Sequence, residues 1–344
     1  MSAFIDITPD LSLATAELAV PSTAPTVWND LRLDAAAETE RIVAGLRRAT
    51  QVELRRRGLV VGLSGGIDSS VSAALAVQAV GPDRVFGLFM PERCSSPESL
   101  ALGQLLAKRL GIVAVVEDIT PTLEAAGCYR RYDEALRQAF PEFVAGCKSK
   151  IVLSPLAPGN QYRVFSAVVE LPDGRVLRRR LPLEAYQQIV AATNFKQRVR
   201  KMLEYYHADR LRYAVVGTPN LLEHDQGFFV KNGDGSADVK PIAHLYKTQV
   251  YQLAEHLGLP EEIRRRPPTT DTYSLEQSQE EFFFSVPYRV LDACLYGKDH
   301  GLSAAEVAAA TDSTVEQVER VYRDIEAKRK AAEYLHAPPW RANL

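Results

Sequence analysis

Apolar and polar positions along the chain alternate between the periods of a strand and of a helix. The apolar run 59–63 lies between a charged stretch and a polar turn, which indicates a fully buried strand. Residues 71–80 then predict a helix built of small side chains. Further strands are expected at 85–90 and 112–119, with a helix at 96–110 between them. Strand–helix–strand order with short connections predicts right-handed βαβ units and a parallel sheet.

Helical periodicity continues on both sides of this region. Residues 27–57 and 184–207 show helical patterns, and 213–216 indicates one more buried strand. The helix expected at 245–257 is followed by Gly258, a residue suited to a helix C-terminus. The predicted fold class is therefore α/β, a Rossmann-like parallel sheet flanked by helices.

One segment breaks this alternation. Residues 164–170 and 175–181 flank the turn sequence Pro172-Asp173-Gly174, which predicts a β-hairpin. We expect the region 150–186 to be inserted into the α/β domain. Three consecutive arginines, 178–180, are typical of a solvated face, and a lid or a partner surface is the alternative.

The last region, 302–340, is predicted to be a helical tail. Ser303 with Glu306, and Ser313 with Glu316, both fit capping boxes. Two short capped helices could imitate a helix-turn-helix DNA reader. Their acidic side chains would repel phosphate, so this interpretation is disfavoured.

Length and composition add limits to this picture. We expect one domain over residues 27–340, preceded by a loose arm over 1–26, because Pro, Ser and Thr interrupt the arm. The 344 residues are 46% hydrophobic and carry 41 Lys and Arg against 43 Asp and Glu, a formal net charge of −2. A near-neutral chain is a poor candidate for non-specific nucleic-acid or anionic-membrane binding.

Cysteine usage and hydropathy point to the cytoplasm. The four cysteines form no C-x-x-C pair and are too sparse for a disulfide framework or a structural zinc site. No apolar run approaches the length that spans a bilayer, and the N-terminus lacks the features of a signal peptide. The cytoplasm is therefore the expected compartment.

The most informative segment joins the first predicted strand to its helix. Backbone N–H groups and a helix N-terminus meet there, which makes an anion site, and glycines allow a phosphate to approach closely. A carboxylate among such groups suggests Mg²⁺ between it and the phosphate. A plain helix start capped by Ser64 is the simpler alternative. The candidate ATP-binding residues of this loop are Ser64, Gly65, Gly66, Ile67, Asp68, Ser69, Ser70 and Val71.

The loop matches neither G-x-x-x-x-G-K-[ST] nor G-x-G-x-x-G. Ser-Gly-Gly-x-Asp-Ser after a strand resembles the pyrophosphate loop of the N-type ATP pyrophosphatases, which have the adenine nucleotide alpha-hydrolase-like fold. Those enzymes cleave ATP to AMP and pyrophosphate and adenylate a substrate. The resemblance implies ATP as a co-substrate and Mg²⁺ as the metal.

Four later motifs narrow the resemblance to the NAD synthetase family. They are a Gly-Thr…Glu segment, a Gly-Phe-Phe-x-Lys-x-Gly-Asp-Gly-x-Ala-Asp segment, a Tyr-Lys-Thr-Gln-Val helix and a Pro-Thr-Thr-Asp turn, at 215–223, 227–238, 246–250 and 268–271. The resemblance covers roughly residues 27–339 apart from the hairpin.

The resemblance assigns roles to residues around ATP. It implies that Asp68 and Glu223 hold Mg²⁺, both being hard oxygen ligands. Lys247 is expected to contact the ATP phosphates, and it joins Asp68 as a candidate catalytic residue. Thr218 and Thr269 are expected to contact ATP at the ends of strands.

Contacts to the second substrate are implied in the same way. Arg198 matches a position that binds deamido-NAD, although an arginine at the edge of an apolar stripe can simply cover the core. Lys231, Asp234 and Asp238 match the family's substrate segment, and Asp234 also fits a purely structural turn. Lys328 resembles one half of a C-terminal His-Lys pair, with alanine in the place of the histidine.

The implied reaction is the amidation of deamido-NAD to NAD through an acyl-adenylate. Departures at 89–93 and after Gly217 keep open a paralogous AMP-forming ligase that amidates a different carboxylate. Fewer than sixty residues precede the first strand, so we expect free ammonia, or ammonia from a separate glutaminase. The family also implies a homodimer.

Overall fold

The computed structural model describes residues 27–153, 165–269, 272–284 and 286–342. The expected arm over 1–26 lies outside these residues. Among the helices of the described part, none is long and apolar enough to cross a membrane.

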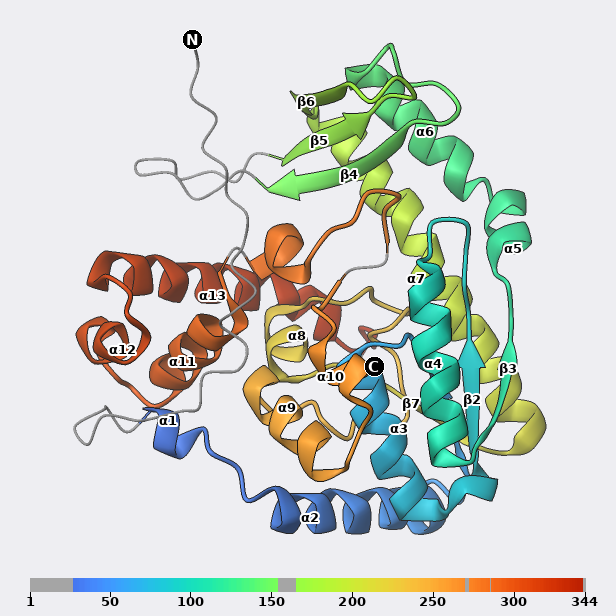
Figure 1. Ribbon diagram of the computed structural model, residues 1–344, viewed down its shortest axis with the longest axis vertical. Coiled ribbons are helices and arrows are strands. Elements are labelled where there is room, and N and C mark those ends of the chain that lie inside the picture. The colour runs from blue at the N-terminus through green and yellow to red at the C-terminus, as the bar shows by residue number, and fades with distance from the viewer. Residues whose placement is uncertain (1–26, 154–164, 270–271, 285, 343–344) are drawn as a thin grey trace.

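A four-stranded parallel sheet forms the centre of the molecule (Figure 1). Its order is β3-β2-β1-β7, with the register Leu59 beside Val85 and Ala214. The predicted parallel sheet is confirmed. The chain leaves β1 toward β2 on one side and returns as β7 on the other, which creates a switch point at the carboxyl ends of β1 and β7. The strands are β1 (Leu59–Gly62), β2 (Val85–Phe89), β3 (Val113–Val116) and β7 (Ala214–Val216).

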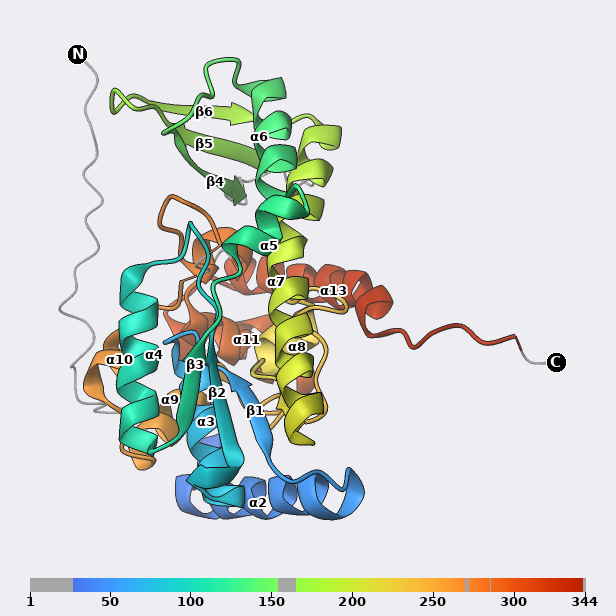
Figure 2. The same ribbon diagram turned by 90° about the vertical axis from the view of Figure 1, so that its right-hand side faces the viewer.

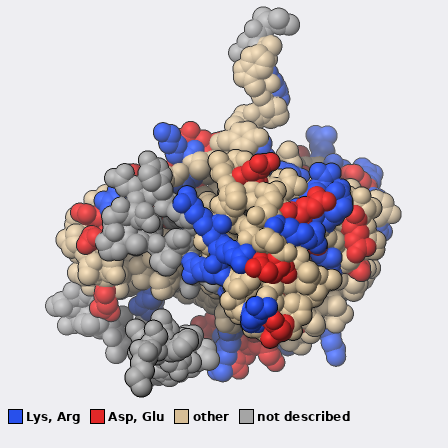
Figure 3. Space-filling model, turned by 90° about the horizontal axis from the view of Figure 1, so that it is seen from above, with Lys and Arg blue, Asp and Glu red and all other residues tan. Residues whose placement is uncertain are grey.

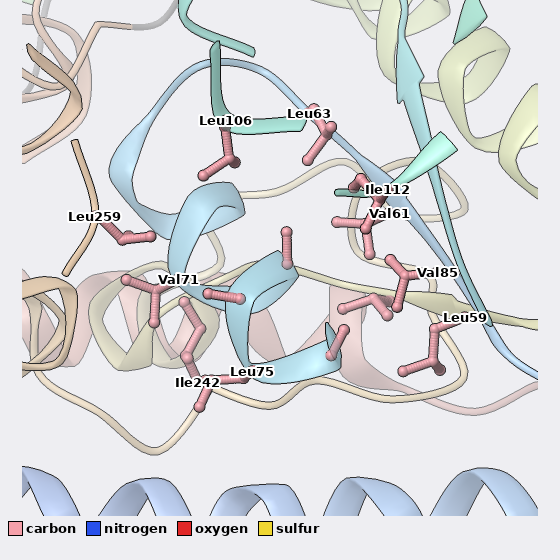
Figure 4. Packing of buried hydrophobic residues seen from close by; sticks show 14 of the residues in the cluster. Leu59, Val61, Leu63, Val71, Leu75, Val85, Leu106, Ile112, Ile242 and Leu259 are labelled. Atoms are coloured by element: carbon pink, nitrogen blue, oxygen red, sulfur yellow. The ribbon is translucent and has the colours of Figure 1, made fainter. Parts of the chain in front are cut away.

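One face of the sheet packs on α3 (Ile67–Val80), which is apolar or small on nearly every side. Strand alternation points Leu59 and Val61 toward this helix, where they meet Val71 and Leu75 in the largest core cluster (Figure 4). Because α3 is packed against α2 and α9 as well as the sheet, most of its side chains are buried, and many of them are small. The helices of this layer are α2 (Ala35–Arg48), α4 (Pro97–Leu110), α9 (Lys247–His256) and α10 (Glu261–Arg265).

The opposite face packs on α7 (Leu183–Leu211), a helix of 29 residues. Val60 and Val215 point this way and pack with Val199 and Ala208. Figure 2 shows α7 running from the sheet to the opposite end of the molecule, with α5 (Thr120–Ala125) and α6 (Cys128–Ala139) alongside its upper part.

A small antiparallel sheet, order β4-β5-β6, stands at that far end. The predicted hairpin is confirmed as β5 (Phe165–Glu170) and β6 (Val176–Arg180), with Gly174 at φ +83° in its turn. The sheet contains one strand more than predicted, β4 (Lys148–Leu153). This strand was not predicted because its first three residues, Lys, Ser and Lys, obscure the apolar alternation. Figure 3 looks down on this end and shows basic and acidic side chains intermingled.

The C-terminal region is helical, as predicted, and encloses a second core with α1 (Val27–Asp30). The box of Ser303 with Glu306 is confirmed. The second box is wrong, because the helix begins one residue later and is capped by Thr314 with Gln317. The helices here are α11 (Tyr288–Asp299), α12 (Ala304–Thr311) and α13 (Val315–His336).

The single helical stretch predicted for 27–57 is divided. The chain leaves the helical conformation after α1, and α2 begins after Asp34, whose side chain caps it. A π-helical turn follows α2. The remaining short elements are η2 (Ala49–Glu53), η3 (Pro82–Arg84), α8 (Leu221–Gln226) and η4 (Glu280–Phe284).

Candidate active site

The loop between β1 and α3 has the shape of an anion site. Gly65 adopts φ +73°, and a Cβ there would lie 2.5 Å from the Ser99 carbonyl oxygen, so no larger residue fits without movement. Gly66 is the N-cap of α3 and has no side-chain capping bond. The first N–H groups of α3 therefore remain available to a phosphate.

The hydroxyls of the loop divide into two groups. The hydroxyl oxygens of Ser64 and Ser69 lie 3.0 Å apart at the N-terminus of α3. The Ser69 hydroxyl also donates to the Gly66 carbonyl. Ser70 donates to the same carbonyl and is buried, and Val71 belongs to the core. Of the eight loop residues predicted to bind ATP, those that line the adjoining cavity are Ser64, Gly66, Ile67, Asp68 and Ser69.

The two predicted metal ligands, Asp68 and Glu223, line the same cavity. Asn220 fixes both. Its side-chain amide donates to the Asp68 carboxylate at 3.0 Å. Its backbone N–H donates to Glu223 at 3.2 Å, within the capping box of α8. Sequence reasoning missed Asn220, although a polar residue directly after a strand-end Thr-Pro was a usable signal.

The electrostatics of this pair favour a bound cation. Burial raises the pKa of Glu223 to about 8, and the neighbouring charge of Asp68 adds to the effect. A divalent ion would supply the missing positive charge, and carboxylate oxygens are what Mg²⁺ prefers. Within the described residues no group of three or more His, Cys, Asp or Glu could hold a metal. These residues therefore fit an ion whose remaining ligands are phosphate oxygens and water.

Lys247 is fully buried at the first position of α9 and forms an ion pair with Asp68. Burial disfavours its charged form, yet the charges of Asp68 and Glu223 outweigh burial and raise its pKa. Asp292, which is also fully buried, accepts from the backbone N–H of Lys247 at 3.2 Å and of Thr248 at 2.7 Å. Asp292 thus holds the start of α9 in place, a role that no sequence pattern signalled.

The cavity has a volume of about 640 Å³ and extends well beyond the loop. Thr218 and Thr269 line it, as the ATP interpretation requires. Arg266 also lines it, and its guanidinium donates to Ser99 at 2.8 Å. The last two residues of the motif at 268–271 lie outside the described part of the chain.

Of the five predicted substrate contacts, only Asp234 lines this cavity, and Lys231 and Arg198 lie outside it. The Lys231 ammonium donates to the carbonyls of Tyr334 and Ala337, at 2.6 and 3.1 Å, and so ties down the end of α13. It borders a separate hollow of about 230 Å³. Arg198 is exposed on α7 and donates to the Lys231 carbonyl at 3.3 Å.

The other predicted substrate residues are mostly engaged within the fold. Asp238 accepts from the Val215 N–H at 2.7 Å. Lys328 is buried and donates to the Phe283 carbonyl at 2.8 Å. It also forms an ion pair with Asp324 on the same helix. Asp234 does line the cavity, and burial raises its pKa.

A parallel sheet with an open helix N-terminus, two carboxylates and a buried lysine at its switch point defines a nucleotide-binding α/β enzyme. Comparison with known families is more specific. The NAD synthase family model matches residues 38–145 and 175–332, and the chain belongs to this family. The family predicted from the four motifs is confirmed. The unmatched residues 146–174 contain β4 and β5.

Curated relatives agree with this assignment. A protein of Rhizobium meliloti (strain 1021) named NH(3)-dependent NAD(+) synthetase is 63% identical over 309 residues, which cover 90% of this chain and 92% of the relative. A protein of Thermotoga maritima with the same name is 38% identical, over 81% of this chain and 91% of the relative.

Solved structures show the same fold at lower identity. NMN synthetase from Francisella tularensis superimposes with a TM-score of 0.64 at 22% identity, over 91% of this chain and all of that one. The NH3-dependent NAD synthetase of Campylobacter jejuni gives a TM-score of 0.59 at 20% identity, with the same coverage.

Proposed function

We propose that this chain is an AMP-forming ligase that amidates deamido-NAD with ammonia. A carboxylate oxygen of the substrate attacks the α-phosphorus of ATP and displaces pyrophosphate. The nitrogen of ammonia then attacks the acyl carbon, the C–O bond to AMP breaks, and a proton is lost. The observation that carries the proposal is that Asp68 and Glu223 line one cavity with the open N-terminus of α3, while the buried Lys247 forms an ion pair with Asp68.

The residues of the chain supply binding and electrostatic stabilisation. The N–H groups at the start of α3 hold phosphate oxygens. Lys247 keeps its proton, because its pKa is raised, and lies where negative charge develops on departing pyrophosphate. Thr218 and Thr269 provide hydroxyls along the same wall and orient ATP.

Asp68 and Glu223 would hold Mg²⁺ in this scheme. The ion would neutralise the phosphate charge and polarise the phosphorus that is attacked. Asn220 keeps both carboxylates oriented, a supporting role that such ligands generally need.

Ammonia is proposed to be free in solution or supplied by a separate glutaminase, since the curated relatives are named as NH3-dependent enzymes. We also propose a homodimer, for which the exposed apolar side chains Met202 and Tyr206 on α7 offer a surface. All four cysteines are free thiols, which supports a reducing, cytoplasmic compartment.

The proposal is tested by incubating the protein with ATP, Mg²⁺, ammonium and deamido-NAD and measuring AMP and NAD by chromatography. We expect the two products in equal amounts. AMP formation with some other carboxylate and none with deamido-NAD would instead support the paralogous ligase, which the names of the close relatives do not favour.

A further inference from the structure

The cavity reaches from the loop between β1 and α3, here called the phosphate loop, to a far end beneath the small antiparallel sheet. Figure 2 shows α7 extending between these two parts of the molecule. Phe165 of β5 and Tyr186 of α7 line the far end, where their rings stack with centroids 3.8 Å apart. The sheet β4-β5-β6, here called the inserted sheet, therefore borders the same cavity as the phosphate loop.

A third part of the cavity wall comes from the chain between α10 and η4. It consists of residues 266–269 and 272–279, here called the Thr269 loop. Figure 1 shows this orange segment extending from α10 toward β4. An isolated β-bridge joins Thr269 to Ser278, so the two stretches lie side by side. The residues of this loop that line the cavity include Thr269, Thr272, Tyr273 and Gln279.

The Thr269 loop is hydrogen-bonded along the free edge of β4. Strand β5 occupies one edge of β4, so backbone groups at the other edge need different partners. The Ser149 N–H donates to the Ser274 hydroxyl at 2.8 Å, and the Ser149 carbonyl accepts from the Leu275 N–H at 3.3 Å. The side-chain amide of Gln277, a residue only 3% exposed, donates to the Ile151 carbonyl. Successive bonds therefore join the loop to this strand.

A buried ion pair holds the same loop from the side of α7. The Lys196 ammonium donates to the Thr272 carbonyl at 2.6 Å and to the Glu92 carboxylate at 2.7 Å. Glu92 follows β2 and also accepts from the Tyr129 hydroxyl at 2.8 Å. Both members of the pair are buried, and hydrogen bonds to charged groups are strong where water is excluded. The Thr269 loop is therefore fixed at two places, and one of them is the inserted sheet.

The attachment to β4 is absent from the family's common pattern. Strand β4 lies wholly within residues 146–174, which the NAD synthase family model does not match, whereas the Thr269 loop lies in a matched range. A loop that is ordered in only a fraction of the molecules lowers the apparent affinity of its ligand by that fraction. A loop that is held in place before the ligand arrives avoids this loss.

We propose that strand β4 is a positioning element for ATP, which bonds Ser274 and Gln277 and so holds Thr269 in place at the cavity before ATP binds. The inference rests on the proposed function, in which Thr269 contacts ATP. Ser274 and Gln277 are positioning residues, because they act through Thr269. Their loss should weaken ATP binding and leave the chemical step unchanged once ATP is saturating.

The test measures KM for ATP and kcat in wild type, S274A, Q277M and the double variant S274A/Q277M. Each single variant removes one hydrogen bond between the loop and β4. KM for ATP should therefore rise about threefold in each single variant and about tenfold in the double variant. The value of kcat at saturating ATP and KM for ammonium should not change. S274T keeps the hydroxyl and should retain the wild-type KM for ATP.

A matched control is Y296F, which removes one hydrogen bond, from the Tyr296 hydroxyl to Asp30, outside the cavity. It should leave KM for ATP unchanged, and thermal melts report the stability of every variant. If S274A and Q277M lower the melting temperature but keep the wild-type KM for ATP, the loop only covers the edge of β4 and the inference is wrong. A fall in kcat, or an equal rise in KM for ammonium, shows a general disturbance of the site and also overturns it.

Failure of the proposed function gives a different result. If wild-type protein turns over no deamido-NAD, calorimetry with ATP and Mg²⁺ still compares wild type with the double variant. Weaker ATP binding by the double variant supports the positioning role without any turnover, and equal binding contradicts it. Hydrogen exchange reports on the loop itself. In ATP-free protein the Leu275 amide should exchange faster in the double variant than in wild type, and equal exchange rates contradict the inference.

Discussion

The two ends of the cavity differ in the side chains that line them and in how those side chains are held. At the phosphate loop, the charged side chains are held by neighbouring residues: Asn220 orients Asp68 and Glu223, and Asp292 holds the backbone of Lys247. At the far end, aromatic rings from an inserted sheet and α7 form the lining, and part of the segment lies outside the family match. The residues of the loop end thus lie within the ranges that the family model matches, whereas the far end includes residues that it does not match.

The largest effect should come from Asp68→Asn. Loss of the charge removes a metal ligand and the partner of Lys247, so turnover should fall roughly a thousandfold. Initial rates of NAD formation measure this. Asp83→Asn, on an exposed turn, is the control and should keep full activity. Retained activity in D68N would remove the metal-site argument and with it the contrast between the two ends.

Lys247→Met should have the next largest effect. It keeps the length of the side chain but loses the buried charge beside the loop, so kcat should fall about a hundredfold. Initial rates of NAD formation with all substrates at saturation give kcat. An effect on KM alone would mean that Lys247 binds ATP without stabilising the departing pyrophosphate.

Gly65 and Gly81 both have a positive φ, but only at Gly65 would an added Cβ meet a neighbouring atom. Comparing the two alanine variants therefore distinguishes the effect of backbone strain from that of steric contact. Gly65→Ala places a Cβ against the Ser99 carbonyl and should raise KM for ATP about tenfold, because the loop must move. Gly81→Ala meets nothing within 4 Å. With φ +87° and ψ 153°, a conformation essentially restricted to glycine, the change should cost about 1–3 kcal/mol of unfolding free energy and no activity. Equal kinetics in the two variants would contradict the tight packing of the loop.

Asp292→Asn should change how stability depends on pH. Burial raises the pKa of Asp292 to about 6, although hydrogen bonds from Thr248 and Lys247 oppose the shift. The folded protein therefore holds this proton more tightly than the unfolded chain. Wild type should lose unfolding free energy as pH rises from about 4 to 6, by about 3 kcal/mol at most, and D292N should lack this contribution.

Urea denaturation of wild type and D292N at both ends of this pH window measures the difference. The other carboxylates titrate in both proteins and cancel in the comparison. If the two proteins show the same pH dependence, Asp292 does not anchor α9 as an ionisable group.

How far the sequence predicts this structure also differs between the two ends. Local signals specified the loop end: a buried apolar strand, a glycine turn and a helix start predicted the parallel sheet and put Asp68 at its edge. Motif resemblance pointed to Glu223, which lines the cavity, and to Lys247, which the fold buries beside Asp68; their roles stay predictions.

Long-range contacts escaped prediction. Nothing in the local sequence pairs Asp292 with the start of α9, because 44 positions separate it from Thr248. Strand β4 was missed because its polar residues obscure the alternation. Phe165 lies in the predicted hairpin, but no local pattern shows that its ring stacks on Tyr186 of the next helix. The roles proposed for Arg198, Lys231, Asp238 and Lys328 depended on resemblance alone and remain predictions.

The most direct test of the adenylation chemistry follows one oxygen atom. Deamido-NAD labelled with ¹⁸O in its nicotinate carboxylate is converted with ATP, Mg²⁺ and ammonium, and AMP is analysed by mass spectrometry. Attack by the carboxylate on the α-phosphorus predicts that each AMP carries one ¹⁸O from the substrate. Unlabelled AMP formed together with NAD would contradict an acyl-adenylate and the mechanism proposed for this site.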